Sequence, residues 1–115
     1  MGCYDNVVVE VWQLPCNERW HGLVFSRLSF WEIEGKKPHQ SDYRLVYKTT
    51  VPAKGFDAKR TMEQLYIKSN MGERLEGFNG RTISVSDVIV FDTCGMKTAA
   101  FVDSVGFKDL TDFFE

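Results

Sequence analysis

Alternation of apolar and polar residues is the feature that most limits how this chain can fold. In residues 4–14, valine occupies positions 7, 9 and 11, so β-branched side chains recur at every second residue. That period places them on one side of a β-strand, where such side chains pack well. Residues 43–51 and 81–91 alternate in the same way, and residues 97–105 are predicted to return as a further strand. The last two of these segments are separated by Asp92-Thr93-Cys94-Gly95, which has the length of a hairpin connection.

One segment has the period of a helix instead. Met62, Leu65, Tyr66 and Ser69 fall on one helical face, at the three- and four-residue spacing of a helix. Asp57 has the side chain and the position of an N-cap. Residues 70–72 contain the Asn and Gly that are typical of a helix end. The sequence therefore predicts one main helix between the second and third strands.

These patterns predict an α+β fold. We expect a small, mostly antiparallel sheet of about four or five strands packed against one main helix, with a short helical turn at residues 109–114. Residues 19–34 fit neither period and are predicted to be irregular, with one helical turn and a short strand as the elements they could contain. The 115 residues are 43% hydrophobic and 14% aromatic, which supplies one core but hardly two. Residues 1–115 are therefore interpreted as a single domain.

The N-terminal residues and the cysteines predict the cellular compartment of the protein. The chain starts without a basic region followed by an apolar one, which a secretory signal requires. The longest apolar run, residues 88–91, is far short of the roughly 20 residues that span a bilayer. Cys3, Cys16 and Cys94 are odd in number and irregularly spaced, so they cannot form a closed set of disulfides. We therefore expect a cytoplasmic protein with no membrane partner.

Charge is nearly balanced over the whole chain but uneven along it. The net charge is −2, which argues against a general nucleic-acid binder. Residues 82–115 hold two bases and six acids. Such a cluster is either a solvated, solubilising face or a patch that binds a basic groove on a partner. The residues of this predicted acidic patch are Asp87, Asp92, Asp103, Asp109, Asp112 and Glu115.

No catalytic or metal-binding pattern stands out. The three cysteines and two histidines do not have the paired spacing of zinc ligands, so no metal and no cofactor are predicted. The two partial matches to a nuclease motif, Glu34-x-Lys36 and Asp57-x-Lys59, are about as many as chance gives. Glycine-rich phosphate loops and a G-x-S-x-G motif are also missing from the sequence. We therefore predict that the protein is not an enzyme.

Asp87 is unusual because it lies within a strongly apolar segment, Thr82-Ile83-Ser84-Val85-Ser86-Asp87-Val88-Ile89. Burying a carboxylate costs several kcal/mol, on the order of 2–7, unless it is hydrogen-bonded. Two interpretations remain open at this point: a structural residue bonded to backbone N–H groups or to a neighbouring Ser or Arg, and a member of the acidic patch.

Aromatic residues cluster in the irregular segment. Trp20, Phe25, Phe30 and Trp31 lie within twelve positions, and Arg19 and Arg27 would form the rim of a patch made by them. Core packing is one interpretation of this cluster. The other is a partner-binding aromatic patch formed by Trp20, Phe30 and Trp31, because aromatic anchors dominate many protein interfaces.

Two motifs in the second half carry a family resemblance. Gly80-Arg81-Thr82-Ile83-Ser84-Val85-Ser86-Asp87-Val88-Ile89 is followed by Phe101-Val102-Asp103-Ser104-Val105-Gly106-Phe107. Together with residues 43–47 and the predicted helix, these motifs resemble the YodL-like domain, an accessory module of bacterial mobile elements. The resemblance covers residues 43–110 and extends through the first strand toward the whole chain. Thr82 and Ala100-Phe101 stand where the family pattern has Ser and a Tyr pair.

The resemblance implies a context rather than a chemistry. Domains of this kind travel on plasmids, conjugative elements and phages, often beside counter-defence genes. We therefore expect a non-enzymatic inhibitor of the anti-CRISPR kind, acting in the host bacterial cell. It would bind a Cas9-type effector nuclease and hinder guide-RNA loading or target access, since such effectors hold nucleic acid in positively charged channels that an acidic patch can occupy.

A second interpretation belongs to a different class. The chain would be a nucleic-acid-binding accessory module of a mobile element, with phosphate contacts made by Lys54, Lys59, Arg60, Lys68, Arg74 and Arg81. A divalent-metal nuclease is a third and weaker interpretation. In both binding interpretations, the motifs at residues 84–89 and 103–107 are open to a purely structural role, because Gly-Phe after a strand suits a turn followed by a core residue.

Overall fold

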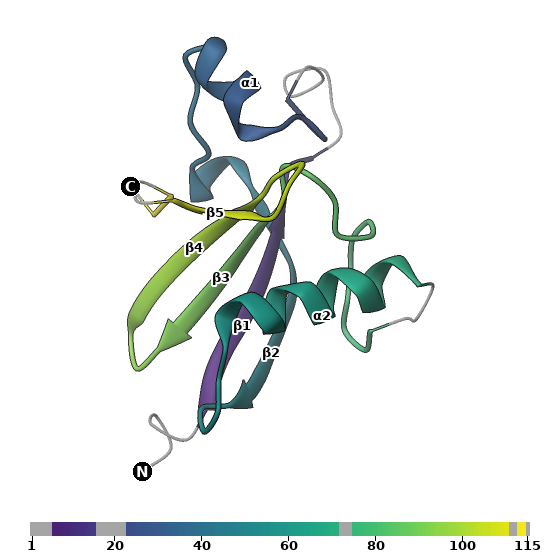
Figure 1. Ribbon diagram of the computed structural model, residues 1–115, viewed down its shortest axis with the longest axis vertical. Helices are drawn as coiled ribbons and strands as arrows, with labels where there is room; N and C mark the ends of the chain where they lie inside the picture. The colour runs from purple at the N-terminus through teal and green to yellow at the C-terminus, as the bar shows by residue number, and fades with distance from the viewer. Residues whose placement is uncertain (1–5, 16–22, 72–74, 111–112, 115) are drawn as a thin grey trace.

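The computed structural model describes residues 6–15, 23–71, 75–110 and 113–114, and Figure 1 draws them in colour. Five strands form one sheet in the order β2-β1-β3-β4-β5, and every neighbouring pair is antiparallel. The α+β prediction is therefore confirmed. The strands are β1 (Asn6–Gln13), β2 (Arg44–Pro52), β3 (Val88–Thr93), β4 (Met96–Val102) and β5 (Phe107–Leu110).

The main helix is α2 (Ala58–Asn70), and it begins where the sequence indicated. The carboxylate of Asp57 accepts a hydrogen bond from the backbone N–H of Arg60 at 3.2 Å, which satisfies one of the free donors at the helix start. Met62, Leu65 and Ser69 are its buried residues, whereas Tyr66, which was predicted on the same face, is exposed because it lies at the edge of that face. Two shorter helical elements precede β2, namely α1 (Leu28–Ile33) and the 3-10 turn η3 (Gln40–Asp42). α1 is the helical element expected within residues 19–34, while the described part of that stretch, residues 23–34, contains no strand.

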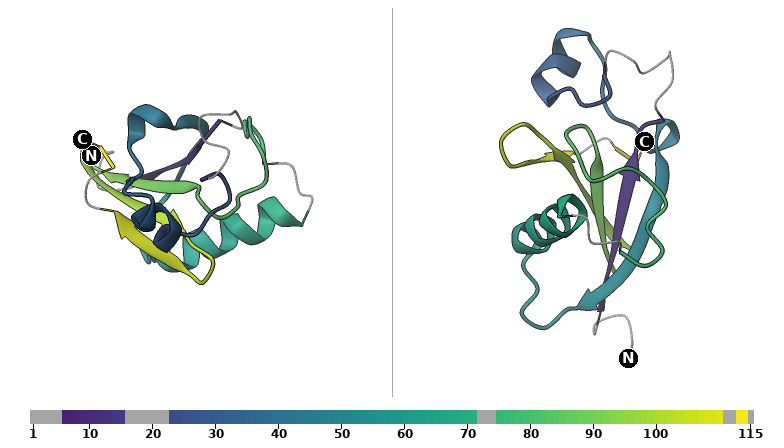
Figure 2. Two further views of the ribbon diagram at one scale, coloured as in Figure 1. Left: turned by 90° about the horizontal axis from the view of Figure 1, so that it is seen from above. Right: turned by 90° about the vertical axis from the view of Figure 1, so that its right-hand side faces the viewer.

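The sheet has an apolar cluster on each face because its inner strands are buried on both sides. On one face, Val9, Ile89 and Val102 belong to the same cluster as Met62 and Leu65 of α2. Figure 2 shows α2 lying along this face, while α1 sits beyond the end of the strands. The second cluster takes side chains of the opposite face together with α1, β5 and the C-terminal turn. Its buried members are Leu14, Leu23, Trp31, Tyr43, Val88, Val90, Ala99, Phe101 and Phe113.

The predicted strand over residues 81–91 is wrong in its first half. β3 begins only at Val88, and residues 81–87 are irregular. Ser86 has a φ of 88°, which a continuing strand does not permit. Most backbone groups of this segment bond to side chains or to a turn, for example Asp87 N to Ser84 O at 3.1 Å, and only at Ser86 and Asp87 do they reach β4, through Val102. The apolar alternation here reflects burial and not sheet pairing.

The C-terminal prediction is also corrected in part. Asp109 and Leu110, which were assigned to a helical turn, belong to β5 and pair with Ala100 and Ala99. The predicted strand over 97–105 becomes Met96–Val102, after which a short loop returns the chain as β5. The hairpin prediction between β3 and β4 is confirmed. Cys94 and Gly95 have φ values of 55° and 88° there, as a tight two-residue turn requires.

Candidate functional site

The acidic residues of the C-terminal third do not form one patch. Asp87 has an exposed fraction of 0%, so it cannot belong to a surface patch. Asp92 lies at the β3–β4 turn, where its carboxylate accepts a hydrogen bond from Gly95 N at 2.8 Å. Asp103 follows the opposite end of β4, roughly 20 Å away at about 3.3 Å a residue. Asp109 is exposed on β5. Asp112 and Glu115 lie outside the described residues.

The aromatic patch is divided in the same way. Trp31 is fully buried in the second cluster, edge-on to Phe101 with ring centroids 5.9 Å apart and stacked near Tyr43. It is therefore a core residue and not a contact surface. Phe30, its neighbour on α1, has an exposed fraction of 38%. Trp20 lies outside the described residues.

A strap formed by residues 79–87 crosses the end of the sheet near α1. Its start is held by Gln13, the last residue of β1, whose side chain bonds both backbone groups of Arg81. Gln13 Nε2 donates to Arg81 O at 2.9 Å, and Arg81 N donates to Gln13 Oε1 at 3.0 Å. A Cβ at Gly80 would overlap Gln13 Oε1 and the side chain of Val46. Glycine is therefore required at position 80 by this close approach.

The middle of the strap is tied to α2. Ser69 Oγ accepts a hydrogen bond from Ile83 N at 2.6 Å, and Asn70 Nδ2 donates to Ile83 O at 3.0 Å. Both backbone groups of Ile83 are thus satisfied by helix side chains while its own side chain is fully buried. At Ile83, side-chain hydrogen bonds from α2 therefore take the place of strand pairing. The apolar and polar residues of the strap alternate as in a strand, although this part of the chain is not one.

Asp87 is the buried centre of the strap. Its Oδ2 accepts from Ser84 N at 2.9 Å and from Gln13 Nε2 at 3.0 Å, and its Oδ1 lies 3.7 Å from Arg81 Nη2. Burial raises the pKa of this carboxyl to about 7, against the lowering influence of its hydrogen bonds and of Arg81. The structural interpretation of Asp87, with bonds to backbone N–H and a nearby Arg, is confirmed.

The two family motifs also hold the segment that leads into α1. Ser86 Oγ accepts from Phe25 N at 3.0 Å, and Ser86 O accepts from the hydroxyl of Tyr43 at 2.6 Å. Burial raises the pKa of Tyr43 well above its usual value, with a further contribution from the nearby charge of Asp87. Asp103 Oδ1 accepts from Leu28 N at 3.2 Å, at the start of α1. The polar side chains of Ser86, Asp87 and Asp103 therefore position other parts of the chain.

What these contacts position is an exposed apolar surface. Phe25 has an exposed fraction of 53% and a φ of 69°, a backbone conformation that an aromatic residue rarely adopts. The Arg81 guanidinium lies 5.3 Å from the centre of its ring. Phe30 is 38% exposed, and Val105, in the loop that Asp103 begins, is 82% exposed. We call Phe25, Phe30 and Val105 the α1-end surface. Sequence analysis included Phe25 and Phe30 in its aromatic cluster but missed Val105.

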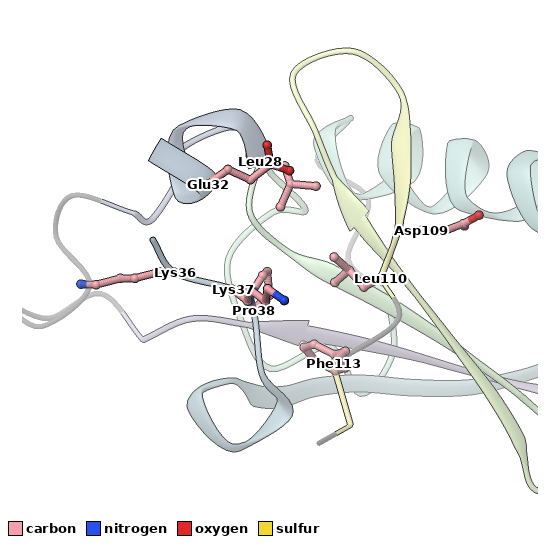
Figure 3. A pocket seen from close by; sticks show the side chains of 8 residues that line it. All are labelled: Leu28, Glu32, Lys36, Lys37, Pro38, Asp109, Leu110 and Phe113. Atoms are coloured by element: carbon pink, nitrogen blue, oxygen red, sulfur yellow. The ribbon is translucent and has the colours of Figure 1, made fainter. Parts of the chain in front are cut away.

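A pocket of about 220 Å³ lies beside this surface, between α1 and β5 (Figure 3). Leu28, Pro38, Leu110 and Phe113 supply its apolar walls. The remaining lining residues are charged: Glu32, Lys36, Lys37 and Asp109. Its mixture of two acids and two bases gives it no dominant charge.

The nuclease interpretation depends on how carboxylates and other metal ligands are placed among the described residues. They contain no group of three His, Cys, Asp or Glu side chains that could hold a metal ion. Asp57, which belongs to one partial nuclease motif, caps α2. Within the same described residues, no helix is long and apolar enough to cross a membrane.

The fold and the strap define a small α+β domain in which buried polar motif residues support an exposed apolar end. The model of the YodL-like domain family matches residues 8–113. The chain therefore belongs to the YodL-like domain family, and the match extends the resemblance at residues 43–110 to nearly the whole chain. Neither the curated proteins nor the solved structures contain a match.

Proposed function

We propose that this YodL-like domain is a non-catalytic counter-defence inhibitor encoded by a mobile element. It acts in the cytoplasm of a bacterial host, where it binds a Cas9-type effector nuclease and hinders guide-RNA loading or target access. The observation that carries the binding part of the proposal is the α1-end surface, with the exposed Phe25, Phe30 and Val105. Exposed apolar groups gathered at one end of a small domain are typical of protein contacts.

The buried polar network supports a binding role more than a catalytic one. Asp87 is fully buried and its neighbours Gln13 and Ser84 bond to it, so it is not placed to meet a substrate. The same network holds Phe25 in a strained conformation with its ring exposed. A strained residue that the surrounding structure enforces is a common feature of binding sites.

The contact we propose differs from an acidic patch. Asp87 is buried, and Asp92 and Asp103 lie at opposite ends of β4, so these residues cannot enter one basic groove together. The apolar α1-end surface takes the role of the anchor instead. Arg27, two residues after Phe25 in the sequence, and Asp109 on β5 are exposed charged groups.

The experiment is size-exclusion chromatography of the purified protein with a Cas9-type effector, with and without guide RNA. Co-elution with the bare effector alone supports interference with guide loading. Co-elution with the guide-loaded effector alone supports interference at target recognition. No co-elution in either state overturns the proposal.

Matched variants test whether the α1-end surface makes the contact. Phe25→Asn removes the ring while keeping a residue that tolerates a positive φ. Met96→Ser removes an apolar side chain that is even more exposed (78% against 53% for Phe25), at the other end of β4. We expect Phe25→Asn to weaken effector binding at least about tenfold, as loss of an interface anchor does, and Met96→Ser to leave it unchanged. Equal effects would remove the surface from the proposal.

A second candidate is the nucleic-acid-binding module. The observation in its favour is that Lys54, Lys59, Arg60 and Lys68 are all exposed, on α2 and the loop before it. Arg81 leaves the set because it is partly buried and its Nη1 donates to Leu14 O at 2.9 Å. Arg74 lies outside the described residues. Retention of a short oligonucleotide that falls steeply with added salt would favour this candidate over the inhibitor.

A further inference from the structure

The outer edge of β5 offers unpaired backbone groups. Within the described residues, β5 is the last strand of the sheet and pairs only with β4. Its orientation follows from the hairpin, where Asp103 N donates to Gly106 O at 3.1 Å, so the backbone of Gly106 faces β4. Alternate residues of a strand turn their N–H and C=O groups to opposite sides. The outward-facing residues of β5 are therefore Phe107 and Asp109.

The other side of β4 gives the same assignment. Val102 accepts a hydrogen bond from Ser86 N at 2.9 Å and donates one to Asp87 O at 2.8 Å. Its backbone groups thus face the strap and not β5. Val102 and Phe107 are opposite each other in the register, so they form a non-hydrogen-bonded pair. The N–H and C=O groups of Phe107 consequently point away from β4.

The pocket adjoins this open edge. Asp109 and Leu110 of β5 line it on one side, and Leu28 and Glu32 of α1 line it on the other. In Figure 3 the carboxylate of Asp109 is directed away from the other labelled side chains. Asp109 therefore contributes mainly its backbone, which is the outward-facing part of the strand. We call the outer edge of β5 together with this pocket the β5 groove.

We propose that the β5 groove binds an extended peptide segment of a partner protein, which adds to β5 as a sixth strand and inserts one apolar side chain into the pocket. Strand addition of this kind takes its affinity from backbone hydrogen bonds and its specificity from pockets for alternate side chains. The groove supplies both: free backbone groups at Phe107 and Asp109, and apolar walls from Leu28, Leu110 and Phe113.

The size and charge of the pocket define the peptide. Pockets for whole small ligands measure about 300–1,000 Å³, and this one, at about 220 Å³, is suited to a single side chain such as leucine or phenylalanine. Lys36 and Glu32 at its rim have opposite charges, so no strongly acidic or basic peptide is selected. The inference goes beyond the proposed function, because it holds whether the partner is a Cas9-type effector or another protein.

The probe is a library of random decapeptides displayed on phage, selected on the immobilised full-length chain. One enriched peptide is then labelled with fluorescein, and its affinity is measured by anisotropy.

Asp109→Pro removes the outward N–H while leaving the hydrogen bonds of Lys108 and Leu110 to β4. An edge strand tolerates proline at such a position. Asp109→Ala is the matched control, since it removes the carboxylate and keeps the N–H. We expect Asp109→Pro to weaken binding about tenfold and Asp109→Ala less than about twofold.

A second measurement tests strand addition without a protein variant, in case Asp109→Pro does not fold. The peptide is N-methylated at one position at a time, and its binding to the unmodified protein is measured. Strand addition predicts that methylation weakens binding at every second position, because only alternate amides face β5. The proposal is overturned if no peptide is enriched, if methylation has no period of two, or if the two Asp109 variants bind equally. It is also overturned if light scattering shows that a second copy occupies the edge. If the peptide tests fail but the protein co-elutes with the effector, strand addition is overturned and the proposed function is not.

Discussion

The two ends of the β3–β4 hairpin are held in different ways. At the turn end, Asp92 bonds Gly95 N three residues away, and Cys94-Gly95 has the backbone of a standard tight turn. At the α1 end, Ser86, Asp87 and Asp103 bond groups that lie far away in the sequence. Asp87 to Gln13 spans 74 residues, and Asp103 to Leu28 spans 75. Local contacts suffice to close a turn, whereas the α1 end needs distant segments to be brought together.

This difference matters because three exposed apolar residues lie at the end that is harder to build, although Leu45 on β2 and Ile67 on α2 are exposed as well. Phe25, Phe30 and Val105 lie where the strap, α1 and the β4–β5 loop meet. At the turn end the exposed apolar residue is Met96, beside the polar Thr93 and Lys97. The long-range network therefore has a use beyond stability, since it presents an apolar surface.

The largest effect on stability is expected from truncating a core side chain at the α1 end. Trp31→Ala deletes a fully buried indole that contacts Phe101 and Tyr43, and large-to-small core changes of this kind cost about 3–5 kcal/mol. We expect urea denaturation to show a loss of about 4 kcal/mol in the free energy of unfolding. The neighbouring Phe30→Ala, which removes an exposed ring, should cost far less. Equal losses would mean that α1 does not pack as described.

The second test uses pH. Because burial raises the pKa of Asp87 from 3.8 to about 7, the folded state binds a proton that the unfolded state releases between these values. The free energy of unfolding contributed by Asp87 is therefore highest below pH 3.8 and is lost as the pH rises through 7, by about 3 kcal/mol between pH 4 and pH 7. Asp87→Asn should remove this slope, while Asp92→Asn at the turn end should retain it. A slope unchanged in Asp87→Asn would contradict the buried ionisable site.

The third test cuts the attachment of the strap. Gln13→Ala leaves both backbone groups of Arg81 without their partner and removes one of the two hydrogen bonds to Asp87 Oδ2, which keeps the bond from Ser84 N. Unsatisfied buried groups cost about 1–3 kcal/mol each, so we expect a loss of about 2–3 kcal/mol by urea denaturation. The exposed Gln64→Ala on α2 is the control, with an effect near zero. If Gln13→Ala leaves the free energy of unfolding unchanged, the strap does not depend on Gln13 for its position.

The smallest effect is expected at the turn end. Asp92→Ala removes the single bond to Gly95 N in a partly exposed turn, which should cost about 0.5–1 kcal/mol. Thermal unfolding, with Thr93→Ala as the comparison, measures this change. A loss as large as that of Gln13→Ala would erase the distinction between the two ends.

The same distinction explains what could be predicted from the sequence. The cap of α2, its buried face and the β3–β4 turn depend on residues within a few positions of one another, and these predictions are confirmed. Residues 81–87 were predicted as a strand because their apolar alternation is visible, whereas the bonds from Gln13 and Ser69 that replace strand pairing are not. Trp31 and Phe30 were assigned to one patch because a helix of six residues is too short to reveal its buried face.

The most direct measurement is amide hydrogen exchange of the chain alone and in complex with a Cas9-type effector. The account predicts slower exchange on binding in residues 23–30 and 103–110, at the α1-end surface and the β5 groove, and no change in residues 92–97 at the turn end. Slower exchange at the turn end, or along α2 with the α1 end unchanged, would contradict the claim that the α1 end is the interaction end of this domain.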